Sequence, residues 1–447
     1  MFEVREIADI VGARLLRVRK AVPARFVHDS RDIEEGDLFV ALPGRHADGH
    51  TFLGEAFRRG ACGALISDPR QAPDDAPNLL VVTDPLHALQ RLASAWRESL
   101  RAPLIAVTGT NGKTTTRTLL AHYLQGDRKT FTAPKNYNTE IGLPLALLAM
   151  PSDAEVGVFE LGAERPGEIG SLTGILHPAV GIITSVGPGH LAGFLTVDAV
   201  VQEKWSLIAG LPHDGLAVVD GDSPLLRERA ADLSLRCITV GFDHGTVRGR
   251  LVREFPRLEV HLEDPKLVLN APLLGRHNAV NLLLAALTAI ELGVPPPLVE
   301  QRTPSFRPVP HRLQPLPAPF GTILDDTYNA NPDSTRAALQ VLAKSGPPSA
   351  RRLFIYGDML DLGRDSAWYH EEIAAWAGRL GIDKILPVGE RAIRACRAVH
   401  PPGFVDTGRE DIVRRIRALL TGKDNVVLVK GSRALGLERL VEELLAA

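Results

Sequence analysis

The stretch 107–116, VTGTNGKTTT, constrains the fold of this chain more than any other segment. The short apolar run PLIAVTG leads into it, and TTTRTLLAHYL, which continues from it, has the spacing of a helix. A common phosphate loop has a glycine, four free positions and then Gly-Lys-Ser/Thr. Here Gly112-Lys113-Thr114 matches the end, but position 107 is valine and the first glycine is Gly109. We therefore expect a strand, a shortened phosphate loop and a helix.

The residue types in this loop suit the binding of phosphate. Glycines let the backbone approach phosphate oxygens, and the amide groups at the start of a helix point at the anion. Lys113 would reach the β- and γ-phosphates, and Thr114 would bind a metal ion. The alternative is a glycine-rich turn with a solvated lysine, but the flanking strand and helix favour the phosphate loop.

Length and composition limit the classes of protein to consider. A chain of 447 residues is too long for one core, so two to four domains are expected. A net charge of −2 gives no electrostatic case for binding nucleic acid or an anionic membrane. No apolar run approaches the ~20 residues of a membrane span, and the N-terminus lacks the apolar core of a secretory signal. The three cysteines share no metal-type spacing, so we expect a cytoplasmic protein without membrane insertion.

Apolar runs alternate with helical segments along most of the chain. This alternation predicts an α/β fold with mostly parallel sheets and crossover helices. We expect three units: a small α/β domain at 1–100, a middle domain at 101–305 and a doubly wound, Rossmann-like domain at 306–447. Shorter alternating strands at 247–275 predict an antiparallel appendage to the middle unit.

Proline content marks the start of the third unit. Nine prolines lie between 294 and 320, and proline disrupts helix interiors and central strands. This stretch is therefore predicted to be a linker without regular helix. Beyond it, strands are expected at TILDD, RRLFIYGD, KILPVG, FVDT and NVVLVKG.

Polar side chains follow two of the predicted strands of the middle unit. Glu160 ends EVGVFELG and His190 follows IITSVGPG, and ligands of open α/β sheets bind at these carboxyl ends. An unpaired carboxylate in a buried strand is costly, so we expect Glu160 to bind a metal such as Mg²⁺. For His190 a metal role and a structural role are both open. Lys204 has the periodicity of a helix lysine with a solvated head group.

The third unit repeats this pattern of polar groups at strand ends. Such groups favour turns individually, but their recurrence at three strands predicts a ligand-binding face. The groups are Asp325, Asp326, Tyr328, Asn329 and Asn331 after the first strand, Gly357 and Asp358 after the second, and Lys430, Gly431 and Ser432 after the last.

Together these segments resemble the Mur ligase family, the ATP-dependent amino-acid ligases of peptidoglycan precursor synthesis. TGTNGKT is similar to that family's phosphate loop, which folylpolyglutamate synthetases share together with the three-domain plan. Four further stretches resemble the branch that adds D-alanyl-D-alanine. They are NYNTEIG at 136–142, DTYNANP at 326–332, GDMLDLG at 357–363 and LVKGSR at 428–433. The resemblance covers nearly the whole chain in family order.

The resemblance implies a role for each motif residue. Lys113, Glu160, His190 and Lys204 would be catalytic. Two Mg²⁺ ions would be held by Thr114, Glu160, His190 and Lys204, the last carrying a carbamate formed from CO2. This role for Lys204 replaces the interpretation of its side chain as a solvated lysine. ATP would contact Thr108, Gly109, Thr110, Asn111, Gly112, Lys113, Thr114, Thr115, Asn278, Arg312, Asp326 and Asn329. The other substrates would contact Ser30, Arg31, Asn136, Asn138, Tyr328 and Asn331, the first two lying in the region that resembles the uridine site.

The chain also departs from the family pattern. Trp205 and Ser206 stand where the family has a glycine and an acidic residue after the modified lysine, and Ala192 stands where Glu is common. His311 replaces the usual glycine before Arg312. None of these changes removes a group that the resemblance assigns to chemistry.

The activity that the resemblance implies is ATP-dependent joining of D-Ala-D-Ala to UDP-N-acetylmuramoyl-tripeptide through an acyl phosphate, by a monomer. A sibling ligase, which adds the third residue or polymerises glutamate, is the alternative enzyme. A nucleotide-binding module without catalysis is the alternative of another class, although Lys113, Glu160 and Lys204 are all present.

Overall fold

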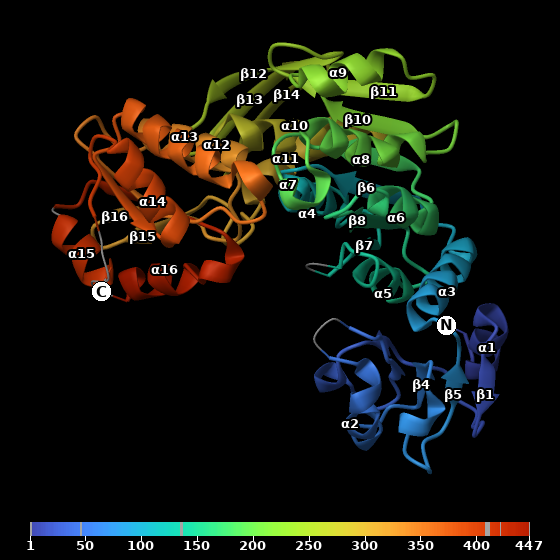
Figure 1. Ribbon diagram of the computed structural model, residues 1–447. Coiled ribbons are helices and arrows are strands. Elements are labelled where there is room, and N and C mark those ends of the chain that lie inside the picture. The colour runs from blue at the N-terminus through green and yellow to red at the C-terminus, as the bar shows by residue number, and fades with distance from the viewer. Residues whose placement is uncertain (1, 45–46, 135–136, 407–411, 421, 447) are drawn as a thin grey trace.

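The computed structural model describes residues 2–44, 47–134, 137–406, 412–420 and 422–446. Three sheets follow one another along the chain, and Figure 1 shows each in its own colour range. The first sheet is blue, the middle sheet runs from cyan to yellow, and the third is orange to red. The α/β fold with three units is therefore confirmed. None of the described helices is long and apolar enough to cross a membrane.

The first sheet has five strands in the order β1-β5-β4-β3-β2, and only the β1–β5 pair is antiparallel. The strands are β1 Arg14–Leu16, β2 Phe26–Val27, β3 Leu38–Val40, β4 Gly63–Ile66 and β5 Leu79–Val81. The helices are α1 Val4–Val11, α2 Leu53–Arg58 and α3 Pro85–Ser99.

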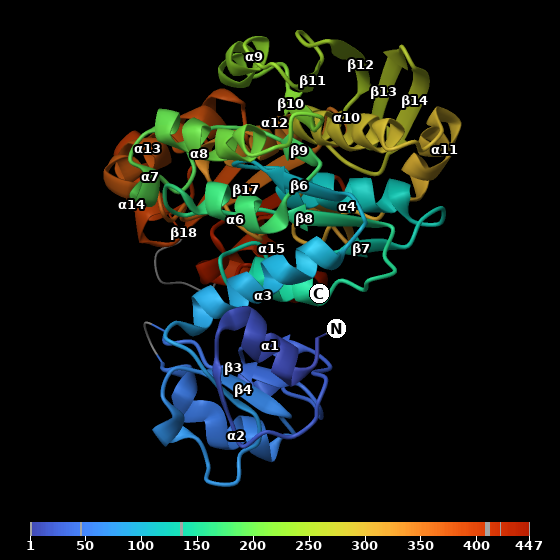
Figure 2. The same cartoon turned by 90° about the vertical axis from the view of Figure 1, so that its right-hand side faces the viewer.

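Helix α3 joins the first unit to the middle unit. Asp84 caps its N-terminus by accepting hydrogen bonds from the backbone N–H groups of Leu86 and His87, and Pro85 occupies a first-turn position, where its missing N–H costs nothing. The apolar side chains of the helix recur at helical spacing and are buried. Among them, Trp96 donates from Nε1 to the backbone oxygen of Met150 at 3.1 Å. Figures 1 and 2 both show α3 between the first sheet and the middle unit.

The middle sheet has nine strands in the order β14-β13-β12-β11-β10-β9-β6-β8-β7. Strand β6 holds Leu104–Thr108, all buried, and lies between β9 and β8, so the strand order reverses there. Such a reversal is where open α/β sheets bind ligands. The other strands are β7 Thr130–Thr132, β8 Val156–Glu160, β9 Val180–Ile183, β10 Leu216–Asp220, β11 Arg236–Gly241, β12 Val247–Arg253, β13 Leu258–Glu263 and β14 Lys266–Ala271.

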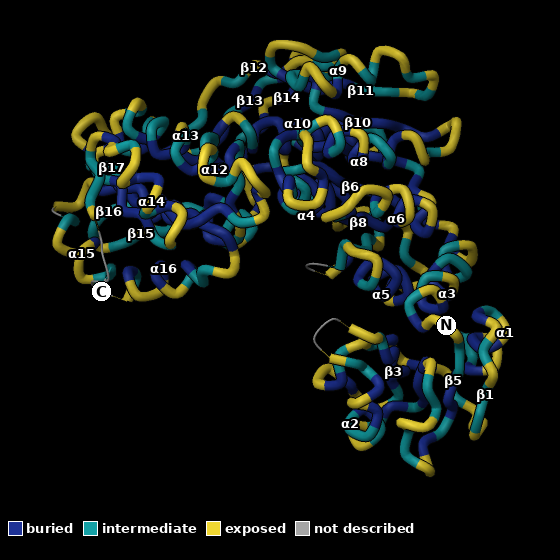
Figure 3. Tube along the Cα trace, viewed as in Figure 1, coloured by how far each residue is buried: buried dark blue, intermediate teal, exposed yellow. Residues whose placement is uncertain are grey.

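Helices cover both faces of the middle sheet and form two separate cores. Helices α4 and α10 contribute to one core, and α3, α5, α6 and α8 contribute to the other. Figure 3 shows the central strands in the buried class between these layers. The antiparallel appendage predicted at 247–275 is confirmed as β12–β14, although β12 also pairs in parallel with β11. The helices are α4 Lys113–Leu124, α5 Gly142–Leu148, α6 Glu168–Leu176, α7 Leu191–Phe194, α8 Val197–Ala209, α9 Pro224–Ala231 and α10 Arg276–Glu291.

The third sheet has the order β15-β16-β19-β17-β18, parallel except for the edge strand β15. The strands are β15 Gln314–Ala318, β16 Gly321–Asp326, β17 Arg351–Gly357, β18 Lys384–Val388 and β19 Asn425–Lys430. The helices are α12 Pro332–Lys344, α13 Ser366–Arg379, α14 Glu390–Val399, α15 Ile412–Leu419 and α16 Glu438–Leu445.

Two local predictions for this region are wrong. The proline-rich stretch contains a helix, α11 Pro296–Arg302, and the strand β15. Prolines occupy only the first turn of α11, where no backbone donor is needed, and β15 is an edge strand. The strand expected at FVDT is absent from the described part of the chain, where Phe404 forms only an isolated bridge to Ile385.

Candidate functional site

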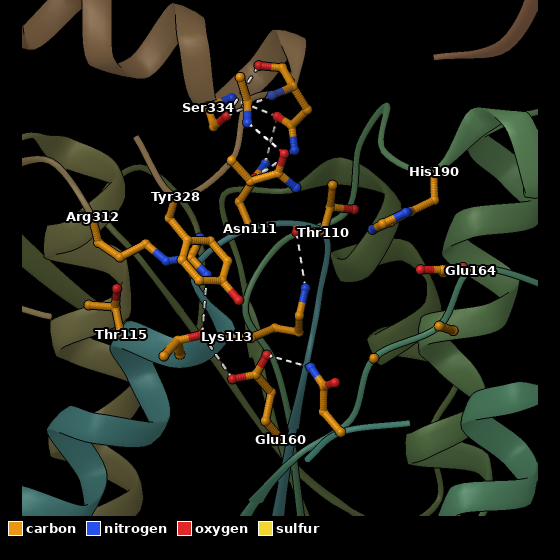
Figure 4. A pocket seen from close by; sticks show the side chains of 18 of the residues that line it. Thr110, Asn111, Lys113, Thr115, Glu160, Glu164, His190, Arg312, Tyr328 and Ser334 are labelled. Carbon is orange, nitrogen blue, oxygen red and sulfur yellow. Dashed lines mark hydrogen bonds between the residues drawn. The ribbon is translucent and has the colours of Figure 1, made fainter. Parts of the chain in front are cut away.

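A polar cavity of about 630 Å³ opens between the carboxyl ends of β6, β8 and β9 and those of β16 and β19. It contains residues from both the middle and the third unit, and Figure 4 shows side chains from both directed into it. The lining residues that the sequence singled out are Thr110, Asn111, Gly112, Lys113, Thr114, Thr115, Asn138, Glu160, His190, Asn278, Arg312, Asp326, Tyr328, Asn329, Asn331 and Lys430.

The phosphate loop connects β6 to α4, as the sequence predicted. Gly109 and Gly112 have φ angles of 147° and 83°, a region that favours glycine. A Cβ atom on Gly112 would lie 2.3 Å from Asn281 Oδ1, so the loop packs closely on α10. Lys113 Nζ donates to the backbone oxygens of Gly109 at 2.8 Å and Thr110 at 3.2 Å. The loop therefore curls around its own lysine, and burial lowers the pKa of Lys113.

Glu160 lies at the end of β8 beside the start of α4. Its carboxylate accepts hydrogen bonds from Thr114 Oγ1 at 2.9 Å and from Asn138 Nδ2 at 2.9 Å. The Glu160 side chain is thereby aimed at the first turn of α4, and Figure 4 shows both bonds. A carboxylate and a hydroxyl in contact, at the site where a helix N-terminus attracts anions, form an oxygen-donor pair of the kind that Mg²⁺ prefers.

His190 and Lys204 interact electrostatically, His190 with both Lys113 and Lys204, and Lys204 with Lys113 of the phosphate loop. His190 is the residue before α7, and burial together with the charges of Lys113 and Lys204 lowers its pKa to about 4. Lys204 on α8 is only 2% exposed, and burial lowers its pKa to about 7. The periodicity-based interpretation of Lys204 as a solvated lysine is thus wrong, because α8 turns this side chain inward toward Phe194, whose ring centre lies 5.6 Å from Nζ.

The third unit places a stacked cation against the phosphate loop. The Arg312 guanidinium lies 3.6 Å from the centre of the Tyr328 ring, and its Nη2 is 3.5 Å from Thr114 Oγ1. Its Nε is buried without a hydrogen-bond partner among the described residues. The Arg312 guanidinium therefore supplies a buried positive charge next to the first turn of α4, the kind of group that binds phosphate or carboxylate oxygens.

A buried ion pair fixes the strand ends behind Arg312. Lys430 Nζ lies 2.6 Å from Asp326 Oδ2 and 3.1 Å from the backbone oxygen of Asn329. The other Asp326 oxygen accepts from the backbone N–H of Leu313 at 3.1 Å. On the middle unit, Asn278 donates to the backbone oxygen of Leu274 and accepts from Asn281.

Some predicted site residues do not line the cavity. Thr108 and Gly109 lie beneath it, and Lys204 lies beside it. Ser30 and Arg31 belong to the first unit, where Ser30 donates to Glu55 and Arg31 pairs with Asp29. Asn136 lies outside the described residues.

The cavity also contains residues that the sequence reasoning did not select. Most of them come from the segment after Glu160 and from α10, and they comprise Gly162, Ala163, Glu164, Arg165, Glu168, His277, Asn281, Leu313 and Ser334. Thr139, Glu140, Ile141 and Ala330 also line the cavity; they lie within the stretches NYNTEIG and DTYNANP but had no individual role assigned. The continuation of Glu160 into LGAERPGE, beyond a strand end, was the available signal for the first group.

The departure at His311 has a structural explanation. His311 has a φ angle of 62°, the left-handed region where glycine is usual. Its Nδ1 lies 2.8 Å from Asp325 Oδ2 and 3.3 Å from Thr327 Oγ1. These contacts hold the unusual backbone conformation, so the loop delivers Arg312 to the cavity without the glycine.

His277 at the start of α10 makes stability depend on pH. Burial lowers its pKa from 6.5 to about 4, so the unfolded chain binds a proton in this range that the folded chain does not. Stability should therefore fall as pH drops from about 6.5 to 4, by up to about 3 kcal/mol from this group. Urea unfolding at pH 6.5 and at pH 4 should show that His277→Gln loses less free energy of unfolding between the two pH values than the parent does. His213→Gln, at an exposed site, should behave like the parent, and an unchanged loss in His277→Gln would contradict the assignment.

Comparisons with known proteins agree with this geometry. Three family models match: the Mur ligase family catalytic domain at 26–99, the Mur ligase middle domain at 107–289 and the Mur ligase glutamate ligase domain at 311–433. The UDP-N-acetylmuramoyl-tripeptide–D-alanyl-D-alanine ligase of Escherichia coli is 30% identical over 447 residues, covering 98% of this chain and 97% of that protein.

Solved structures of MurF proteins have the same fold from end to end. MurF from Acinetobacter baumannii superimposes with a TM-score of 0.89 at 28% identity, covering 100% of this chain and 99% of that one. MurF from Thermotoga maritima, solved in complex with ADP, gives 0.84 at 27% identity, with coverage of 94% and 97%. This chain therefore belongs to the Mur ligase family, among its UDP-N-acetylmuramoyl-tripeptide–D-alanyl-D-alanine ligases.

Proposed function

We propose that this chain joins D-Ala-D-Ala to UDP-N-acetylmuramoyl-tripeptide at the expense of ATP, as a ligase of peptidoglycan precursor synthesis. The observation that carries the proposal is the shared cavity, in which the phosphate loop of the middle unit faces Arg312, Asp326 and Tyr328 of the third. Relatives that cover the whole chain bear this activity in their names. We also propose domain boundaries near 100 and 305, a cytoplasmic location and a monomeric state.

The cavity fits the triphosphate of ATP. The first N–H groups of α4 have no acceptor within the helix, and they lie beside Lys113 at the carboxyl end of β6. Arg312 approaches the same turn from the third unit. Asn278, Asp326 and Asn329 also line the cavity, and they would contact the nucleoside. MurF from Thermotoga maritima was solved with ADP, which agrees with nucleotide binding in this fold.

The donor set also fits Mg²⁺. Thr114 and Glu160 would hold one ion, and His190 with a carbamylated Lys204 would hold another. The described residues contain no group of three or more His, Cys, Asp or Glu side chains placed to hold a metal, and a carbamate on Lys204 would add an anionic ligand. A buried amine whose pKa is lowered to about 7 is substantially neutral at neutral pH, and a neutral amine adds to CO2 to give a carbamate and a proton. When bound, Mg²⁺ would neutralise charge on the phosphates during transfer.

The reaction proceeds in two displacements. A carboxylate oxygen of the tripeptide attacks the γ-phosphorus of ATP, the bond to the β-phosphate oxygen breaks, and ADP and an acyl phosphate result. The amine of D-Ala-D-Ala then attacks the acyl carbon, inorganic phosphate leaves, and the nitrogen loses a proton. Lys113 and Arg312 stabilise the charge on the transferred group, and closure of the third unit over the loop excludes water from the acyl phosphate.

The remaining substrate groups are assigned partly to the first unit and partly to residues of this cavity. Ser30 and Arg31 of the first unit would bind the uridine portion. Asn138 and Tyr328 would contact the peptide, as would Asn136, which lies outside the described residues. Arrangement of the reactants by three separate units would supply much of the rate enhancement.

The test is phosphate release from ATP with UDP-N-acetylmuramoyl-tripeptide, with and without D-Ala-D-Ala, combined with mass detection of the product. We expect release that requires both substrates and forms the UDP-pentapeptide. Release that follows a single amino acid would reassign the chain to a sibling ligase. ATP binding without any release would indicate a non-catalytic nucleotide-binding module.

A further inference from the structure

A pair of asparagine side chains connects the phosphate loop to the third unit. Asn331 Nδ2 donates to Asn111 Oδ1 at 2.7 Å, and Asn111 Nδ2 donates back to Asn331 Oδ1 at 3.3 Å. The two residues are 220 positions apart in the chain and lie in different units. Figure 4 shows this contact at Asn111, above Lys113. The same two amides thus satisfy each other in both directions.

On the third unit, Asn331 is the N-cap of α12, and the capping hydrogen bonds fix its side chain. Its Oδ1 accepts from the backbone N–H of Ser334 at 2.9 Å, and Ser334 Oγ accepts from the backbone N–H of Asn331 at 3.1 Å. This capping box fixes the side chain before it meets Asn111. The Oδ1 atom of Asn331 therefore accepts hydrogen bonds from both Ser334 and Asn111, and its Nδ2 donates to Asn111. Because the donor and the acceptor of this amide are both engaged, few hydrogen-bonding positions remain for the substrate contact that the family resemblance implied.

On the middle unit, Asn111 is tied to the end of β9. Its backbone N–H donates to Ser185 Oγ at 2.9 Å, and its backbone oxygen accepts from Ser185 Oγ at 3.1 Å and from Thr184 Oγ1. Asn111 is therefore the point where the phosphate loop, the segment after β9 and α12 meet.

Two glycines in the segment after β9 let α12 come this close. A Cβ on Gly187 would lie 2.1 Å from Asp333 Oδ2, and a Cβ on Gly189 would lie 2.6 Å from Thr110 Cγ2 and 3.8 Å from Asn331 Nδ2. The segment therefore packs against both the loop and the start of α12, and the asparagine pair lies within this packed contact.

From these contacts we infer that Asn331 is a positioning residue for ATP turnover, acting through Asn111. With the third unit in place, the pair braces the tip of the phosphate loop; with the third unit away, Asn111 loses that brace. Closure of the third unit and the geometry of the phosphate loop are thereby coupled. This inference rests on the proposed function for its kinetic consequence, but its structural consequence is independent of it.

A double-mutant cycle measures the coupling. Asn331→Ser keeps an N-capping side chain but is too short to reach Asn111, and Asn111→Ser removes the other amide. Each variant should lower kcat about tenfold, with ATP affinity changed less than about threefold, as expected for two lost hydrogen bonds. The double variant should be no slower than either single variant, because both remove the same contact. A double variant whose kcat falls by the product of the two single effects would overturn the inference. So would a raised KM for either peptide substrate with kcat unchanged, because that result would assign Asn331 to substrate binding.

Hydrogen exchange tests the same coupling without any turnover. In Asn331→Ser, amides of the phosphate loop should exchange several-fold faster than in the parent, although the substitution lies 220 residues away. The control is Gln340→Ser, an exposed position on the same helix, which should leave the loop unchanged. Unchanged exchange of the phosphate-loop amides in Asn331→Ser would overturn the inference, whatever the enzyme activity. If the parent had no ligase activity but Asn331→Ser still showed faster loop exchange, only the proposed function would be overturned.

Discussion

Lys204→Ala should lower the rate of ligation at least about a thousandfold, because loss of an ion that stabilises phosphate charge removes several kcal/mol from the transition state. The fold should remain intact. Lys204 is 2% exposed, its Nζ lies 5.6 Å from the centre of the Phe194 ring, and it forms no ion pair among the described residues, so its removal costs packing but no buried ion pair. Phosphate release and a thermal melt of the same preparation would measure both effects.

Two controls separate the carbamate from simple packing. Lys204→Met keeps the length of the side chain and should be as inactive as Lys204→Ala. Lys129→Ala removes an exposed lysine that forms a surface ion pair with Asp153, and it should retain full activity. Growth or incubation with isotope-labelled bicarbonate should label the parent at Lys204 and neither position-204 variant. Near-normal turnover in Lys204→Met would rule out the metal-bridging assignment.

Asp326→Ala should destabilise the third unit by about 3–5 kcal/mol, because it leaves the Lys430 ammonium buried without its partner. Lys430 is 2% exposed, and Asp326 Oδ2 at 2.6 Å is nearer to its Nζ than the backbone oxygen of Asn329 at 3.1 Å, so the variant removes its nearest partner. Urea unfolding monitored through the third unit would measure the change. The same variant should also bind ATP weakly, since Asp326 lines the nucleotide side of the cavity.

Removal of both charges should restore most of the stability but not the activity. The double variant Asp326→Leu/Lys430→Met replaces the ion pair by apolar groups, which is often neutral in a buried site. The matched surface pair, Lys344 with Glu254, is partly exposed, and Lys344→Ala should cost less than about 1 kcal/mol. If Asp326→Ala were as stable as Lys344→Ala, the buried pair would have no role in holding the strand ends together.

The sequence predicted those parts of the site that are local in the chain. A strand, two glycines, a lysine and a helix are contiguous at 104–124, so their arrangement follows from backbone physics. Glu160 was identifiable because a carboxylate inside an apolar strand needs a partner, and Thr114 and Asn138 are those partners. The third sheet was likewise recognisable from its apolar runs.

Tertiary contacts decided the features that the sequence did not predict. Periodicity alone placed Lys204 at the surface, because a helix pattern does not show that α7 and Phe194 cover that face. The contact between Asn111 and Asn331 joins positions 220 apart, and a single sequence contains no information on such a pair. The proline-rich stretch contains α11 and β15 because the prolines of these elements lie where a backbone N–H donor is not needed. Such positions are the first turn of a helix and an edge strand of a sheet.

The position of α3 has a consequence for how the molecule unfolds. Its buried face belongs to one apolar cluster that runs from α1 and the first sheet through α5, α6 and α8 of the middle unit. Contiguous apolar contacts make a cooperative unit, so the first and middle sheets should melt as a single thermodynamic body even though they are separate in the chain. The third unit has two apolar clusters, one of which includes Leu274 of the middle unit, and polar contacts of Arg312 and Asn331 also join the two units. The first and middle units are thus expected to unfold as one cooperative block, and the cavity lies where the third unit meets that block.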